Sequence, residues 1–229
     1  MKKIGLVGGT GPESTLMYYK ELNTRIDQMT NGKAMPDLAI ESVDFRKAWD
    51  FVSSGENEKL ADYLSEKVFC LKSTGCEVIS LTAGTMHLVI NEIEKKTGVS
   101  LVSIPKAVAE DAVKNGYKRV GLLGTIFTME QDYMKKDLID AGIEVCIPEK
   151  ADRELVAKRI LEELELGIVK EETLKEFQEL ISKMKEEQGI QAVILGCTEL
   201  PLLLNEKNSP LPVLDSVEIH IRKLVELAM

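Results

Sequence analysis

The chain has 229 residues, enough for one large domain or two small ones with substantial cores. Its net charge is −9, from 38 acidic and 29 basic residues, so no basic surplus is available to neutralise phosphates, which argues against nucleic acid as a partner. With 44% hydrophobic and 29% charged residues the composition is that of a soluble globular protein, and no apolar run reaches the ~18 residues of a membrane span.

Apolar runs rich in β-branched residues alternate with amphipathic stretches along the chain. The expected strands are 3–8, 38–43, 77–82, 100–103, 119–123, 143–147 and 191–196. The expected helices are 13–30, 56–75, 86–97, 105–115, 129–141, 152–166, 171–188 and 216–228. The basic and apolar start, "MKKIGLVGG", faintly resembles a signal peptide, but it is too short and fits a first strand better. Alternation of strand and helix predicts an α/β protein with parallel sheets.

Two pairs of similar segments indicate an internal duplication. "KSTGCEVISLTAGT" is similar to "EEQGIQAVILGCTE", and "KKIGLVGGT" is similar to "KRVGLLGT". Gly121 lies 116 positions after Gly5, and Cys197 lies 114 positions after Ala83, both close to half of the 229 residues. The sequence therefore predicts two α/β domains related by a pseudo-twofold axis, each with a mainly parallel sheet flanked by helices.

The duplication also predicts where a ligand binds. We expect a first domain of residues 1–99 plus 211–229, with a returning C-terminal helix, and a second domain of residues 100–210. Ligands of open parallel sheets bind at the carboxyl ends of the strands. If the halves face each other, an active site lies in the cleft between them, and four turns meet there: 8–15, 83–87, 124–128 and 196–199.

The four cysteines show no CxxC pair and no short disulfide framework, which predicts reduced thiols and a cytoplasmic location. Cys197 follows a strand and precedes an expected helix start, where unpaired N–H groups favour a thiolate, so we favour a functional role over a buried structural one. Cys70, Cys76 and Cys146 lack that context and are interpreted as structural. The only histidines, His87 and His220, are not in a ligand-spaced cluster, so no metal is expected.

Two further motifs were weighed. "GLVGGTGPEST" lacks the third glycine of a dinucleotide fingerprint, so a turn whose amides face a small anion such as a carboxylate is preferred to a nicotinamide-cofactor site. His87 could act as a general base, but a capping or packing role at the start of its helix is at least as well supported.

The quoted motifs resemble those of a known superfamily. "GLVGGTGPEST", "SVDF", "TMH", "GLLGT…TMEQDY", "GCTE" and "PVLDS" occur in the order found in the aspartate/glutamate racemase superfamily, in its cofactor-independent aspartate racemase and broad-specificity amino-acid racemase branch. The resemblance covers nearly the whole chain. It implies a homodimer that uses neither pyridoxal phosphate nor metal and acts on a free amino acid. One thiolate takes the Cα proton, and a second thiol delivers a proton to the opposite face.

This chain departs from the family pattern in its first half. The family usually has Cys-Asn-Thr-x-His there, and this chain has Ala83, Gly84, Thr85, Met86 and His87. The second-half motif is intact, with Cys197, Thr198 and Glu199. The resemblance therefore implies a racemase with Cys197 as one acid/base and no cysteine opposite it.

Three readings follow from this departure. In the first, which we favour, Thr82 or a bound water beside Ala83 supplies the second proton of a racemase. In the second, one thiol suffices for a one-sided reaction of the decarboxylase or lyase type. In the third, the chain binds an amino acid or dicarboxylate without turnover. An introduced alanine would explain Ala83 but not Gly84.

The expected substrate-binding residues lie in the four turns and are Thr10, Gly84, Thr85, Met86, Thr125, Thr198 and Glu199. Of these, Thr10, Gly84, Thr85, Thr125 and Thr198 are expected to meet the carboxylate groups of the substrate.

Overall fold

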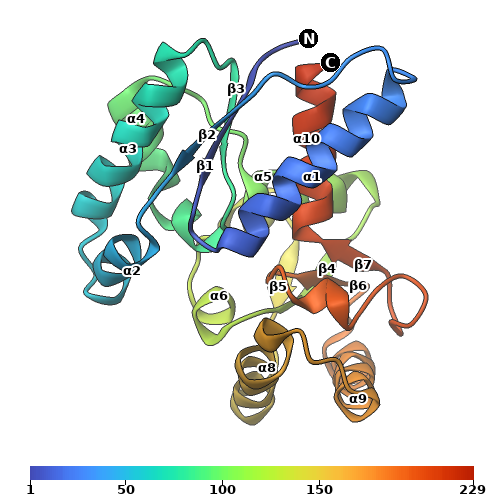
Figure 1. Cartoon of the computed structure of the whole chain (residues 1–229). Helices are drawn as coiled ribbons and strands as arrows, with labels where there is room; N and C mark the ends of the chain where they lie inside the picture. The colour runs from blue at the N-terminus through green and yellow to red at the C-terminus, as the bar shows by residue number, and fades with distance from the viewer. The chain divides into compact units, whose positions relative to one another are not determined.

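The computed structural model describes all 229 residues, and they form two compact units. The first unit comprises Met1–Ser103 and His220–Met229, and the second comprises Ile104–Ile219 (Figure 1). Each unit holds a parallel sheet flanked by helices, so the predicted α/β class is confirmed.

The sheet of the first unit has three parallel strands in the order β2-β1-β3. The strands are β1 (Ile4–Gly8), β2 (Leu38–Ser42) and β3 (Val78–Leu81). Every residue of β1 and β3 is buried, which matches their apolar composition, whereas β2 is an edge strand and is only partly buried. Because the strands are parallel, their carboxyl ends share one edge of the sheet.

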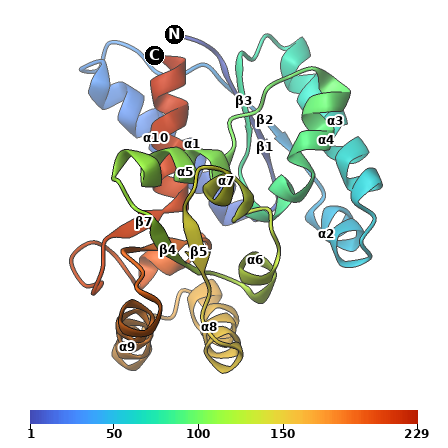
Figure 2. The same ribbon diagram turned by 180° about the vertical axis from the view of Figure 1, so that it is seen from behind.

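Helices cover both faces of this sheet. They are α1 (Pro12–Met29), α2 (Phe45–Ser53), α3 (Asn57–Ser73), α4 (Ile90–Thr97) and, from residue 220 onward, α10 (Ser216–Ala228). A 3-10 helix, η1 (Gly84–Val89), precedes α4. Figures 1 and 2 show α3 and α4 on one face and α1 with the last part of α10 on the other. In α1 the buried residues Ser14, Tyr18, Leu22 and Ile26 recur every four positions, so one face of the helix packs on the core.

The sheet of the second unit has four parallel strands in the order β5-β4-β6-β7. The strands are β4 (Arg119–Leu123), β5 (Glu144–Cys146), β6 (Ala192–Leu195) and β7 (Val213–Asp215). The helices are α5 (Ile104–Lys114), α6 (Ile126–Glu130), α7 (Lys136–Asp140), α8 (Lys150–Glu162) and α9 (Glu171–Gln188). Two 3-10 helices complete the unit, η2 (Leu164–Leu166) and η3 (Leu200–Leu202).

The second unit has an apolar core on each face of its sheet. Val156 of α8 and Phe177 of α9 pack with Leu123 and Leu195, whereas Val108 of α5 and Leu138 of α7 pack with other residues of β4 and β6. Figure 2 shows α5 beside α7, and α8 beside α9.

Several expected elements differ from the observed ones. Helix α2 was not expected from its aromatic-rich sequence, but the Asp44 side chain caps it by accepting hydrogen bonds from the N–H groups of Arg46 and Lys47. The expected strand 100–103 is reduced to one bridge, between Ser80 and Val102. The expected helix 129–141 is split into α6 and α7.

The C-terminal segment also differs from the expected domain boundary. Residues 211–219 were expected in the first domain, but β7 pairs with β6, so they belong to the second unit. Only His220–Met229 returns to the first unit. A three-residue strand is too short to be recognised from its composition.

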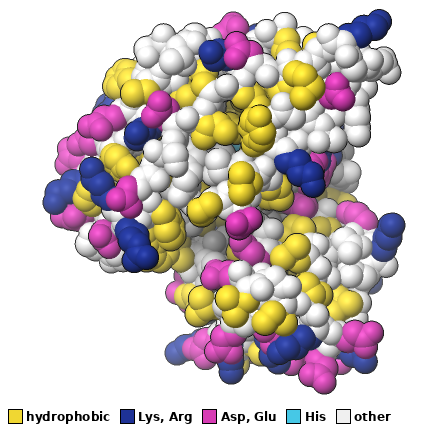
Figure 3. Space-filling model, viewed as in Figure 1, with side chains coloured by type: hydrophobic (Ala, Val, Ile, Leu, Met, Phe, Trp, Pro, Cys, Tyr) yellow, Lys and Arg dark blue, Asp and Glu magenta, His cyan; other side chains and the backbone are white.

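No helix is both long enough and apolar enough to cross a membrane. Acidic and basic side chains are interspersed on the face seen in Figure 3. No group of three or more His, Cys, Asp or Glu residues is arranged to hold a metal ion.

Candidate functional site

In the turn after β1, the backbone at Gly9 lies close to the backbone of Val43. Gly9 has φ +85°, and a Cβ atom there would lie 2.6 Å from the carbonyl oxygen of Val43, so no other residue fits. The Gly9 N–H donates to Thr15 Oγ1 at 3.0 Å, which holds the turn against the start of α1.

Thr10 lies in this turn and has an unsatisfied hydroxyl. The residue is 8% exposed, and its Oγ1 atom has no hydrogen-bond partner. A buried hydroxyl without a partner carries an uncompensated desolvation cost. The N-terminus of α1 follows directly, and its N-cap, Gly11, offers no side-chain cap. The Thr10 hydroxyl and these N–H groups can thus bind an anionic ligand by donating hydrogen bonds to it.

The turn after β3 carries the predicted first-half motif. Thr82 is fully buried, and its hydroxyl donates to the carbonyl oxygen of Val7 at 3.3 Å and lies 3.4 Å from Thr15 Oγ1. The carbonyl oxygen of Thr82 accepts a 2.7 Å hydrogen bond from Ser14 Oγ. The Thr82 side chain therefore points into the core of the first unit.

Ala83, Gly84 and Thr85 are half-buried at the carboxyl edge of the sheet, and Met86 is buried. A Cβ atom on Gly84 would meet nothing within 4 Å, so a larger side chain would have room there. Neither Ala83 nor Gly84 supplies a group that can exchange a proton.

His87 closes this turn. Its Nδ1–H donates to the carbonyl oxygen of Ala83 at 3.1 Å, because a carbonyl oxygen can only accept. Burial lowers the pKa of His87 to about 4, so the ring is neutral at physiological pH. This geometry favours the capping role over the general-base role.

In the second unit, the turns after β4 and β6 converge on one threonine. A Cβ atom on either Gly124 or Gly196 would lie 2.9 Å from the methyl group of Thr128, so both positions require glycine. Thr125 caps α6 by accepting a 3.2 Å hydrogen bond from the N–H of Thr128. The hydroxyl of Thr128 also lies 2.9 Å from that of Tyr133.

Cys197 lies in the turn after β6 and is half-buried. Its Sγ–H donates to Oε2 of Glu199 at 2.8 Å. Burial, followed by the charge of Glu199 and this hydrogen bond, raises the pKa of the thiol far above its usual range. The expectation of a thiolate stabilised by a helix N-terminus is therefore wrong, because only the three-residue η3 follows and a carboxylate lies beside the sulfur. Thr198 is half-buried between these two residues.

Glu165 in η2 interacts electrostatically with Cys197 and Glu199 and was not among the predicted site residues. Desolvation and then the charge of Glu199 raise its pKa, and its own charge contributes to the raised pKa of Cys197. Two carboxyl groups and a thiol thus share one electrostatic environment in the second unit. Nothing in the spacing of "ELELG" distinguishes Glu165 from its acidic neighbours.

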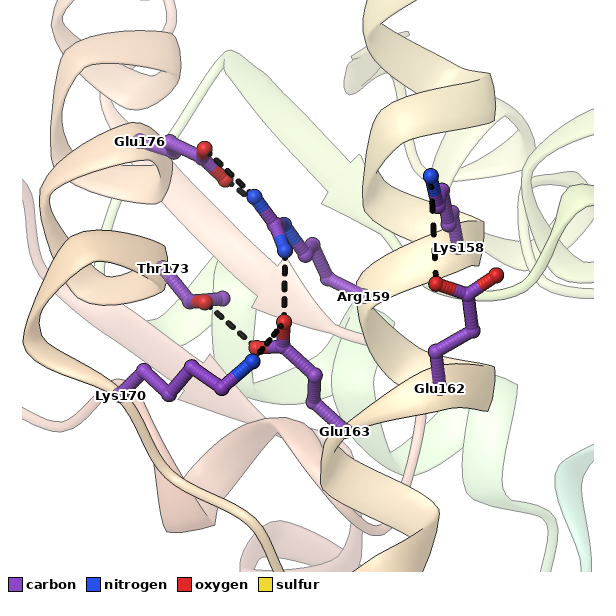
Figure 4. Close-up of polar contacts among 7 residues, drawn as sticks. All are labelled: Lys158, Arg159, Glu162, Glu163, Lys170, Thr173 and Glu176. Carbon is purple, nitrogen blue, oxygen red and sulfur yellow. Dashed lines mark hydrogen bonds and ion pairs between the residues drawn. The ribbon is translucent and has the colours of Figure 1, made fainter.

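An ion-pair network around buried Glu163 fixes the segment that carries Glu165 (Figure 4). The carboxylate of Glu163, 3% exposed, accepts hydrogen bonds from Arg159 at 2.6 Å, Lys170 at 2.9 Å and Thr173. Arg159 is also paired with Glu176 of α9. The bonds from Thr173 and Lys170 lower the pKa of Glu163 to about 2. The network ties the end of α8 to the start of α9, with η2 between them.

Comparison with known proteins identifies the relatives of this chain. A model of the family "Asp/Glu/Hydantoin racemase" matches residues 7–224. A Yersinia pestis crystal structure described as a candidate Asp/Glu racemase is 38% identical, with a TM-score of 0.94, and the match covers 100% of this chain and 99% of that one. An aspartate racemase homologue from Pyrococcus horikoshii is 40% identical, with a TM-score of 0.90 and the same coverage. The broad-specificity amino-acid racemase RacX of Bacillus subtilis is 24% identical over 221 residues, 93% of this chain and 92% of RacX.

Proposed function

We propose that this chain, which belongs to the Asp/Glu/hydantoin racemase family, is an amino-acid racemase that needs no cofactor and uses Cys197 as one acid/base. The observation that carries the proposal is the 2.8 Å hydrogen bond from the Cys197 thiol to Glu199. This hydrogen bond pairs the protonated thiol of Cys197 with a carboxylate that can accept its proton.

The Cys197–Glu199 pair would transfer the Cα proton on one face of the substrate. In one direction the S–H proton moves onto Glu199, the sulfur takes the proton from Cα, and the substrate keeps the electron pair of the C–H bond as a carbanion. In the other direction the S–H delivers its proton to that carbanion. Desolvation, the largest cause of the raised thiol pKa, persists once Glu199 is protonated, so the thiolate is a strong base, as abstraction of a weakly acidic Cα proton requires.

The two carboxyl groups beside Cys197 suit a cationic substrate group. The ammonium group of an amino acid near Glu165 and Glu199 would offset their mutual repulsion and lower the cost of forming a thiolate. A dicarboxylate without an ammonium group lacks this interaction, which favours an amino acid as the substrate.

The substrate carboxylate would be held by N–H and hydroxyl groups of the strand-end turns. In the first unit, the unpartnered hydroxyl of buried Thr10 and the backbone N–H groups of Gly84 and Thr85 are candidates. The N–H of Met86, which was also expected to bind substrate, donates to the carbonyl oxygen of Ala83 at 3.3 Å. In the second unit, Thr125 and Thr198 are candidates. Donors fixed before the reaction stabilise the charge that develops on the carboxylate as Cα is deprotonated.

The opposite face requires a proton source other than a thiol. The hydroxyl of Thr82 already donates to Val7, so it would have to leave that bond to act. We therefore favour a water molecule beside the small Ala83 side chain and keep Thr82 as a candidate. The homodimer and the cytoplasmic location remain predictions from the family resemblance and from the cysteine pattern.

A one-sided reaction is the second candidate function. The observation that favours it is the lack of any proton-transferring side chain at Ala83 and Gly84. An enzyme of this kind would form or protonate a carbanion at Cys197 alone and would retain one configuration.

The test is incubation with the L- and D-enantiomers of aspartate, glutamate and other amino acids, followed by chiral chromatography. The proposal predicts that both enantiomers of at least one amino acid give the racemate, that Cys197→Ser abolishes conversion, and that Cys70→Ser, at an exposed cysteine, does not. Conversion retained in Cys197→Ser, or no conversion by the unmodified protein, would contradict it.

A further inference from the structure

A polar network at the centre of the first unit joins three elements that are distant in the sequence. His220 of α10 is fully buried, and its Nδ1 lies 2.6 Å from the hydroxyl of Tyr18 in α1. Its Nε2 lies 2.9 Å from Ser80 Oγ in β3 and 3.0 Å from the carbonyl oxygen of Val102. Tyr18 and Ser80 are also fully buried.

The partners of His220 determine its tautomer. The carbonyl oxygen of Val102 can only accept, so Nε2 carries the proton and donates to it. Ser80 Oγ donates to the same carbonyl oxygen at 2.6 Å. Nδ1 is then an acceptor and takes the proton of the Tyr18 hydroxyl. The single Nε2–H is then shared between the carbonyl oxygen of Val102 and Ser80 Oγ, and the imidazole ring is neutral with a fixed orientation.

This ring contacts both ends of the β3–η1 turn, defined here as residues 80–87. Ser80 begins the turn segment, and His87 ends it. The rings of His220 and His87 meet edge to face, with centroids 6.4 Å apart. His87 also donates a hydrogen bond to the carbonyl oxygen of Ala83 within the turn. His220 therefore contacts Ser80 at one end of the segment and His87 at the other.

We propose that His220 is a positioning residue that holds the β3–η1 turn in the geometry that binds the substrate carboxylate. The proposal rests on the proposed function for its consequence in catalysis, but the positioning itself is independent of it. Thr82 is also tied to β1 and α1 by hydrogen bonds to Val7 and Ser14, whereas Gly84 is open around its Cβ position and Ala83 to Thr85 are half-buried. Without the ring, Ser80 and Tyr18 would lose buried partners and the turn would lose support at both ends.

The network offers three graded variants and two controls. Tyr18→Phe removes the bond to Nδ1, His220→Gln keeps a donor near the Nε2 position, and His220→Leu removes the interactions of both ring nitrogens. Tyr19→Phe changes the neighbouring tyrosine, which is 50% exposed, and is the local control. Thr173→Val is expected to destabilise the second unit without touching His220. It therefore distinguishes a general loss of stability from a displacement of the β3–η1 turn.

Amide hydrogen exchange over residues 80–87 is the readout that does not depend on activity. We expect faster exchange in this segment in His220→Leu, partial recovery in His220→Gln, and wild-type exchange in Tyr19→Phe and Thr173→Val. In the activity assay we expect kcat/KM to fall by about 10²-fold in His220→Leu, because a ~1 Å misplacement of a positioning element has an effect of this size. Alkylation of Cys197, which reports on the second unit, should be unchanged.

Unchanged exchange over residues 80–87 in His220→Leu would overturn the proposal, whether or not the protein turns over an amino acid. An equal increase in Thr173→Val would also overturn it, since the effect would then reflect general destabilisation. If the wild-type protein shows no turnover, the proposed function fails and the hydrogen-exchange comparison alone decides the positioning role. If His220→Leu does not fold, Tyr18→Phe gives the same comparison with a smaller expected effect.

Discussion

The Sγ atom of Cys197 and the Oε2 atom of Glu199 are 2.8 Å apart and joined by a hydrogen bond in which the thiol is the donor. A carboxylate in this position keeps the proton on sulfur, and burial acts in the same direction. The Cys197 thiol is therefore protonated and can act as an acid. The carboxylate that holds it in this state can also receive the proton when the sulfur must act as a base.

Replacing Glu199 by Gln should make Cys197 more reactive towards an alkylating agent. The change removes the negative charge and the strong acceptor, two of the causes that raise the thiol pKa, so the thiolate fraction at a given pH increases. We expect faster alkylation of Cys197 by iodoacetamide at pH 8, followed by mass spectrometry. Glu165→Gln should have a smaller effect, because its charge contributes less.

Exposed Cys70 provides the internal reference for this experiment, since its alkylation rate should be the same in every variant. Equal rates at Cys197 in the wild type and Glu199→Gln would contradict the assigned hydrogen bond. In the racemase assay the same variant should lose activity despite its more reactive thiol, because the proton acceptor is missing.

A thiol at position 83 should strengthen proton transfer on the face that lacks a side-chain acid. Ala83→Cys is expected to increase racemisation, and a positioned acid/base typically contributes about 10²–10⁴-fold to a proton-transfer step. Ala83→Ser has a side chain of similar size without the acidic thiol and is the matched control. Gly84→Asn should be tolerated in both backgrounds, because no atom lies within 4 Å of a Cβ at Gly84. Equal activity in Ala83→Cys and Ala83→Ser would exclude this position as the origin of the second proton.

The network around Glu163 should be a measurable source of stability. Thr173 is fully buried and donates its hydroxyl proton to the Glu163 carboxylate, so Thr173→Val keeps the shape and leaves the carboxylate short of one donor. We expect a loss of about 1–3 kcal/mol in the free energy of unfolding, measured by urea denaturation.

Lys158→Ala on the same helix is the control for this measurement (Figure 4). Its ion pair with Glu162 is 3.9 Å long, and both side chains are more than half exposed, so its removal should have little effect on stability. Equal losses in the two variants would show that the buried network contributes no more than an exposed ion pair.

The two buried histidines predict how stability depends on pH. Burial lowers the pKa of His220 to about 3 and that of His87 to about 4, whereas both rings titrate at ~6.5 in the unfolded chain. Between these values the unfolded chain binds more protons, so stability rises with pH up to ~6.5 and then levels off. Each ring contributes up to about 1.4 kcal/mol per pH unit.

His220→Gln should therefore show a shallower rise in Tm between pH 5 and 6.5 than the wild type. The carboxyl groups are common to both proteins, so their titration cancels in the difference. Parallel curves for the two proteins would contradict a neutral, buried His220.

The periodic elements of this fold could be predicted from the sequence because their residues carry local signals. The all-buried strands β1 and β6 are unbroken apolar runs, and α9 has a regular amphipathic pattern that ends at Gly189 in the left-handed conformation. By contrast, β7 is three residues long and is defined by its pairing with β6, which no local pattern records.

The candidate site could likewise be predicted only where its residues carry a local sequence signal. Cys197 and the glycine turns stand out because small residues follow apolar strands, and Gly9 and Gly196 prove to be positions where a Cβ would clash. Glu165 and His220 could not be found, because their roles depend on contacts formed across 30 or more residues of chain. The protonation state of the Cys197 thiol could not be predicted from the local sequence either, because it depends on the orientation of the Glu199 side chain.

The central claim, that Cys197 transfers the Cα proton of an amino acid, is tested most directly by ¹H NMR of L- and D-aspartate and L- and D-glutamate in D₂O with the wild-type protein and Cys197→Ser. We predict loss of the Cα proton signal from both enantiomers of one amino acid with formation of the racemate, and no loss in the variant. Loss from one enantiomer with retained configuration would assign Cys197 to a one-sided reaction. Loss of the signal that persists in Cys197→Ser, or no loss from any amino acid with the wild type, would contradict the claim.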